Sequence, residues 1–130
     1  MLRLALLALA LCVALLAGCG DDDDSTASAD PQRYCGLVRE LERAGQETFA
    51  KVEQQPNATA KDFEAAERQF VKDNEARLQE LEQAAPEAVR PDVAILLDAT
   101  RGRAGLGPPV PEGESGAAER RVQTFEKRNC

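Results

Sequence analysis

The chain has 130 residues, with 23 acidic and 16 basic side chains, a formal net charge of −7 and no histidine. The acidic balance argues against a nucleic-acid-binding surface, which requires clustered basic charge. The lack of imidazole excludes Ser-His-Asp and Cys-His catalytic constellations and removes the commonest zinc ligand.

The chain begins with a short basic and apolar segment that is typical of an export signal. Arg3 supplies a positive charge, and residues 4–16 are apolar without interruption. A helix of that length covers about 20 Å, against about 30 Å for the hydrocarbon core of a bilayer, so it is short for a permanent span. We therefore predict a cleaved signal peptide over residues 1–18, with an uncleaved membrane anchor as the alternative.

Residues 16–19 read Leu-Ala-Gly-Cys, which resembles the lipobox of bacterial lipoproteins. The resemblance implies that the Cys19 thiol receives a diacylglycerol and that cleavage after Gly18 leaves Cys19 as the acylated N-terminus. Cleavage would remove Arg3 but no acidic residue, giving a mature charge of −8. Such a chain is unsuited to lying on anionic lipid, so we expect the lipid on Cys19 to hold it on the extracytoplasmic face of the cell membrane.

Residues 19–30 are predicted to form an acidic, flexible tether. They include four consecutive aspartates, Asp21 to Asp24, and no large apolar side chain. Such a composition favours a disordered, extended spacer. A calcium site is the alternative, but consecutive carboxylates without spaced ligands and a turn glycine do not form an oxygen cage. We expect no metal and no cofactor.

Two long amphipathic helices are predicted next. The first starts at Asp30 and Pro31, a favoured N-cap and first helical residue, and ends near Gln54. The second starts at a capping box formed by Thr59 and Asp62 and is closed by Pro86. The first apolar stripe comprises Tyr34, Leu37, Val38, Leu41, Gly45, Phe49 and Val52, and the second comprises Phe63, Ala66, Phe70, Asn74, Leu78, Leu81 and Ala85.

Asn74 is the only strongly polar residue within these two stripes. One interpretation is a polar contact to a ligand, or a residue that fixes the register of the helices. The favoured interpretation is an edge residue whose amide reaches water.

Two shorter helices complete the predicted domain. The third begins at Pro91, points Val93, Leu96, Leu97 and Thr100 inward and ends before Gly102 or Gly105. Residues 105–116 contain four glycines and three prolines, which predicts a semi-rigid crossover with a polyproline II run, or alternatively a PxxP ligand. The last helix runs from about Ala117 to Arg128, with Ala118, Val122 and Phe125 inward and Arg121 and Glu126 among its outward residues.

Cys35 and Cys130 are the two thiols that remain once Cys12 is cleaved off and Cys19 is acylated. In an oxidising compartment such a pair is most simply a disulfide. It would join the first turn of the first helix to the end of the last helix. A metal-binding or catalytic pair is the alternative, but the chain has no histidine and no CxxC motif.

The lipobox, the acidic tether, the "DP..YC" helix start and the final "A...V..F....C" helix resemble small uncharacterised lipoproteins of actinobacteria. Together these patterns predict an all-α domain over residues 31–130, a four-helix, up-down-like bundle closed by the N-to-C-terminal disulfide. We expect no enzymatic activity but a lipid-anchored interaction module that docks an envelope protein and no nucleic acid. The alternative is a small-ligand-binding lipoprotein, with a pocket between helices near Gly45 and Asn74.

Overall fold

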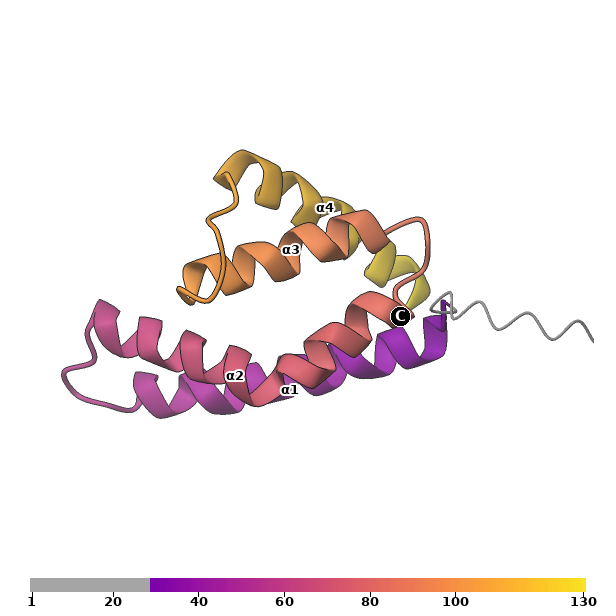
Figure 1. Ribbon diagram of the computed structural model, residues 1–130. Helices are drawn as coiled ribbons and strands as arrows, with labels where there is room; N and C mark the ends of the chain where they lie inside the picture. Colours follow the sequence, from indigo (N-terminus) through magenta and orange to yellow (C-terminus); the bar gives the residue numbers. More distant parts are fainter. Residues whose placement is uncertain (1–28) are drawn as a thin grey trace, which may run out of the picture.

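The computed structural model describes residues 29–130, which form four α-helices and contain no strand (Figure 1). In chain order the helices are α1 (Pro31–Glu53), α2 (Ala60–Ala84), α3 (Arg90–Arg103) and α4 (Glu112–Asn129). The prediction of an all-α, four-helix domain is confirmed. The predicted signal peptide, lipobox and most of the tether lie outside the described residues.

The first three helices begin where their capping residues predict. The Asp30 carboxylate accepts a 2.9 Å hydrogen bond from the backbone N–H of Arg33, which satisfies one of the free N–H groups at the start of α1. The Asp62 carboxylate accepts 2.7 Å hydrogen bonds from the backbone N–H and the hydroxyl of Thr59. Pro91 lies in the first turn of α3, where its missing N–H costs nothing.

The predicted start of the last helix was wrong. Helix α4 begins at Glu112, five residues before Ala117, and it ends at Asn129. Glycine and serine in the first turns are poor helix formers. However, Glu112 and Glu114 place carboxylates at the positive end of the helix dipole, which favours helix there.

The crossover between α3 and α4 is therefore shorter than predicted, and two glycines allow it to turn back on α3. A Cβ at Gly102 would lie 2.6 Å from the carbonyl oxygen of Pro108, so only glycine fits at this close approach. Gly105 has φ 68°, in the left-handed region that favours glycine. Pro111, before α4, has φ −58° and ψ 135°, close to the predicted polyproline II conformation.

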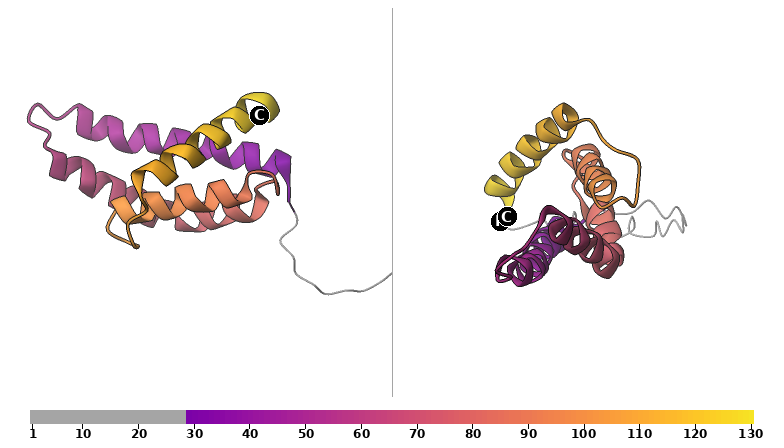
Figure 2. Two further views of the ribbon diagram at one scale, coloured as in Figure 1. Left: turned by 90° about the horizontal axis from the view of Figure 1, so that it is seen from above. Right: turned by 90° about the vertical axis from the view of Figure 1, so that its left-hand side faces the viewer.

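The helices form two antiparallel hairpins, α1–α2 and α3–α4, which contact each other mainly through α2 and α3 (Figure 1). Helix α4 approaches α1 at its C-terminal end and diverges from it toward its N-terminal end (Figure 2). The first hairpin also extends beyond the second at the α1–α2 loop (Figures 1 and 2). Helix α3 stays against α2 as far as its C-terminal end, where Arg68 donates to the Ala104 carbonyl and Arg103 donates to Glu67, both over 2.9 Å, so the divergence concerns α4 and α1 (Figure 2).

The core lies between the hairpins, and its largest fully buried side chains are Tyr34, Leu37 and Val71. Val71 was not on the predicted stripe of α2, whereas Phe63, which was, is 38% exposed. Phe63 lies in the first turn of α2, on the part of the first hairpin that extends beyond the second, so little covers it.

Candidate binding groove

A largely apolar groove of about 220 Å³ opens between the two hairpins, and all four helices contribute to its walls. The groove is open to solvent, and its lining includes Tyr34 and Glu126, at the end where α4 approaches α1. Its lining residues are Tyr34, Val38, Leu41 and Glu42 of α1, Phe70, Leu78 and Leu81 of α2, Val93, Leu96, Leu97 and Thr100 of α3, and Val122 and Glu126 of α4. Most of these belong to the apolar stripes of the helices.

The polar groups of the groove centre on a hydrogen bond between its first and last helices. The buried Tyr34 hydroxyl donates to Oε1 of Glu126 over 2.8 Å. The Tyr34 ring meets Phe125 edge to face, with the ring centroids 6.3 Å apart. Burial raises the pKa of Tyr34 far above its usual value, and the Glu126 carboxylate raises it further. The phenol therefore stays protonated and remains a donor.

Glu126 is a half-buried carboxylate in an environment that opposes its charge. Burial raises the pKa of Glu126, and the nearby Glu42 carboxylate raises it further, while the hydrogen bond from Tyr34 acts in the opposite direction. Among residues 29–130, no arginine or lysine nitrogen lies within 4.0 Å of a carboxylate oxygen of Glu126 or Glu42. The groove thus has an acidic edge without a cation.

Other carboxylates that tie helices together do have cationic partners. Arg121 donates to both oxygens of the largely buried Asp92 over 2.6 and 2.9 Å, and joins α4 to α3. Arg33 donates to both oxygens of Glu80 over 2.6 and 2.9 Å, and joins α1 to α2. These hydrogen bonds lower the pKa of Asp92 and of Glu80. Glu126 differs from both, since its hydrogen-bond donor is neutral.

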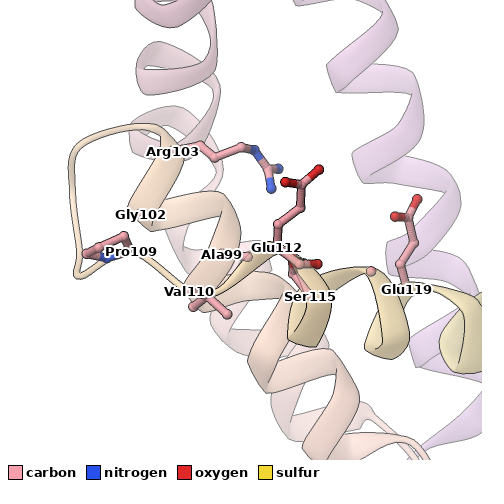
Figure 3. A pocket seen from close by; sticks show the side chains of 9 residues that line it. Ala99, Gly102, Arg103, Pro109, Val110, Glu112, Ser115 and Glu119 are labelled. Atoms are coloured by element: carbon pink, nitrogen blue, oxygen red, sulfur yellow. Dashed lines mark hydrogen bonds between the residues drawn. The ribbon is translucent and has the colours of Figure 1, made fainter.

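A second pocket, of about 490 Å³, lies between the C-terminal half of α3, the crossover and the start of α4 (Figure 3). Its one cation, Arg103, already donates to Glu67 over 2.9 Å, and this pairing offsets its charge toward an anionic ligand. Glu112 and Glu119 add negative charge to the same open hollow. No arrangement of these groups indicates a particular ligand, so the groove is the better candidate.

The structure tests three of the predicted site residues. Cys35 and Cys130 form the predicted disulfide, with their Cα atoms 5.4 Å apart. Asn74 does not reach water as an edge residue: it is 5% exposed. Its amide donates to the carbonyl of Phe70 and accepts from Arg77, both within α2, and it does not line the groove. Gly18 and Cys19 lie outside the described residues.

Glu126 was predicted to lie on the outer face of the last helix, and that prediction was wrong. Glu126 follows Phe125 and lies four residues after Val122, so helical spacing places it on the edge of the inward stripe. That spacing, together with a tyrosine on the first inward stripe, was the available signal. The pairing of the two residues depends on how α4 crosses α1, which local spacing does not define.

Over residues 29–130, no group of three or more cysteine and acidic side chains is arranged to hold a metal ion. None of the four helices in this range is long and apolar enough to cross a membrane. The chain matches no protein-family model, no curated protein and no solved structure at a significant level.

Proposed function

We propose that the protein is a lipid-anchored interaction module on the extracytoplasmic face of the cell membrane, and that its groove docks an apolar side chain of an envelope protein. The anchor rests on the apolar segment 4–16 and on the lipobox that ends at Cys19. The docking role rests on a single observation, the open apolar groove between the two hairpins.

The size of the groove favours a protein partner over a free small ligand. Pockets that enclose small ligands typically measure about 300–1,000 Å³ and cover most of the ligand surface. At about 220 Å³, and open on one side, this groove has room for one or two apolar side chains. Val38, Leu81 and Leu96 remain partly exposed along it, so a side chain of a partner can reach apolar surface there.

Photo-crosslinking in native membranes tests this proposal. The full-length protein would carry a photoreactive benzophenone side chain either at Val38, in the groove, or at its exposed neighbour Arg39 as the matched control. We expect the Val38 position to crosslink to one defined envelope protein and the Arg39 position not to do so. Cys19→Ser should release the protein from the membrane and abolish the crosslink.

Two results would contradict the proposal. Equal crosslinking from both positions would indicate random encounters and would remove the groove as the docking site. A defined small molecule that is extracted from the native protein, without any protein crosslink from Val38, would favour the small-ligand-binding alternative.

A further inference from the structure

We propose that the side chain docked in the groove is flanked, within one helical turn, by a lysine or arginine of the same partner, and that this cation pairs with Glu126 and Glu42. This inference rests on the proposed function, because it names the chemistry of the partner that the groove selects.

Glu126 has hydrogen-bonding capacity that no other side chain of the domain uses. An ionised carboxylate accepts about four hydrogen bonds through its two oxygens. Within residues 29–130 the Glu126 side chain accepts a single one, at Oε1, from Tyr34. The other oxygen, Oε2, has no side-chain donor in this range and remains accessible, since no buried side-chain oxygen of the described residues lacks a partner. The groove therefore has an acceptor at its wall for a donor that comes from outside the domain.

The charge around that acceptor comes from two carboxylates. Glu42 on α1 and Glu126 on α4 both line the groove, and their negative charges repel each other. A neutral apolar side chain would remove more water from Glu126 and supply no compensating charge. An acidic partner would add a third negative charge. A lysine or arginine beside the apolar group relieves the repulsion and supplies the missing donors.

The arrangement of apolar and charged residues in the groove favours a cation that belongs to a protein. The apolar lining of the groove comes from all four helices, whereas its two carboxylates come from α1 and α4. A peptide backbone lying across the opening presents both groups at once, as an amphipathic helix does when it docks in a groove. A small amine, by contrast, would have to supply both the apolar group and the cation from a single short chain.

Synthetic peptides test the charge preference directly. Three amphipathic helical peptides would share a leucine stripe and differ at the flanking positions, which are lysine, glutamine or glutamate. Their binding to the detergent-solubilised full-length protein would be measured by fluorescence anisotropy, with hexylammonium as a competitor. We expect the lysine peptide to bind about tenfold more tightly than the glutamine peptide and the glutamate peptide to bind most weakly.

Substitutions in α4 test whether the preference for the lysine peptide depends on Glu126. Glu126→Gln keeps an acceptor for the Tyr34 hydroxyl but removes the charge, so it should weaken the lysine peptide about tenfold and leave the glutamine peptide nearly unchanged. Glu119→Gln, an exposed position of α4 outside the groove, serves as the control and should change neither.

The inference is overturned if no peptide binds, if the lysine and glutamine peptides bind equally, or if Glu126→Gln weakens both to the same extent. It is also overturned if hexylammonium displaces the lysine peptide at concentrations comparable to that of the peptide itself, since a small amine would then suffice. Each of these results leaves the proposed function standing if Val38 still crosslinks to an envelope protein. Loss of that crosslink counts against the proposed function instead.

Discussion

Tyr34 and Glu126, 92 positions apart in the chain, are joined by a 2.8 Å hydrogen bond from the phenol to the carboxylate. Tyr34 lies in the first turn of α1 and Glu126 in the last turn of α4, beside the Cys35–Cys130 disulfide. One covalent and one polar link therefore hold the same two helix ends together. Away from them α4 diverges from α1 (Figure 2), while Tyr34 and Glu126 themselves line the groove.

Glu126→Gln should stabilise the protein near neutral pH. A carboxyl group whose pKa is raised by folding contributes stability that is fully present below its ordinary pKa of 4.5 and is lost as the pH rises through the raised value. Near neutral pH the charged Glu126 therefore opposes folding, and glutamine removes that charge. Because the Glu126 side chain is still partly exposed to water, we expect a gain of no more than about 1 kcal/mol.

Urea unfolding at about pH 7 and about pH 4 provides the measurement, since these values lie on either side of the ordinary glutamate pKa. The advantage of Glu126→Gln should shrink at the lower pH, where Glu126 itself becomes protonated. Glu119→Gln controls for the loss of one carboxylate from α4. If the native protein is more stable than Glu126→Gln near neutral pH, folding favours the charged form of Glu126 and this prediction is wrong.

The starts of the first three helices could be predicted from the sequence because they depend on local chemistry. Asp30 and Asp62 satisfy free N–H groups within three residues of themselves, and Pro91 fits only an early helical position. The start of α4 was missed because propensity alone ranks Gly113 and Gly116 as poor helix residues. The disulfide followed from counting the remaining thiols.

The groove itself could not be predicted, because it depends on how α4 crosses α1, which local spacing does not define. The same spacing rule places both Asn74 and Glu126 near inward stripes. One is buried and satisfied within its own helix, and the other faces a groove and bonds to a residue of a different helix. Whether such a residue is buried within its helix or pairs with another helix depends on how the helices pack, which is a property of the assembled core.

Arg121→Gln should destabilise the contact between α3 and α4. It breaks two hydrogen bonds to Asp92 and leaves that largely buried carboxylate without a cation. Because the Arg121 side chain is itself mostly exposed and water screens its charge, we expect a modest loss of stability. Arg120→Gln, at the exposed neighbouring position, is the matched control and should have little effect on the urea midpoint. Equal effects of the two variants would contradict a specific role for the Asp92 pair.

The same pair predicts an acid dependence of the opposite sign to that of Glu126. The hydrogen bond to Arg121 lowers the pKa of Asp92, so its contribution is present above the ordinary value of 3.8 and is lost as the pH falls through the lowered one. The difference between the native protein and Arg121→Gln should therefore shrink in strong acid.

Gly102→Ala and Gly113→Ala should have opposite effects on stability. A Cβ at Gly102 would collide with the backbone of Pro108, which cannot move without shifting the crossover, so we expect a loss of about 1–3 kcal/mol. A Cβ at Gly113 meets no atom within 4 Å. Alanine there should stabilise the first turn of α4 by about 0.5–1 kcal/mol. Thermal melting of both variants provides the comparison, and a stabilising Gly102→Ala would contradict the close approach.

Replacing both cysteines, Cys35→Ser with Cys130→Ser, should lower the melting temperature and loosen α4 first. The disulfide closes a loop across 95 positions, and loss of a native disulfide typically costs about 2–5 kcal/mol. For a domain of this size each kcal/mol corresponds to about 4–8 °C. Without the bond, α4 keeps its contacts with α3 and is held against α1 by the Tyr34–Glu126 hydrogen bond and the Tyr34–Phe125 ring contact.

Hydrogen exchange can separate this local loosening from a general loss of stability. In the double variant the amides near Val122 should exchange sooner than those near Leu78 of α2, because helix opening begins where tertiary contacts are fewest. Reductant should bring the native protein to the behaviour of the variant and leave the variant unchanged. Maleimide labelling of the unreduced, denatured protein provides the direct check: if both Cys35 and Cys130 react, no disulfide was present. If α4 and α2 lose protection together on reduction, the disulfide stabilises the whole bundle. The prediction that α4 loosens first would then be wrong.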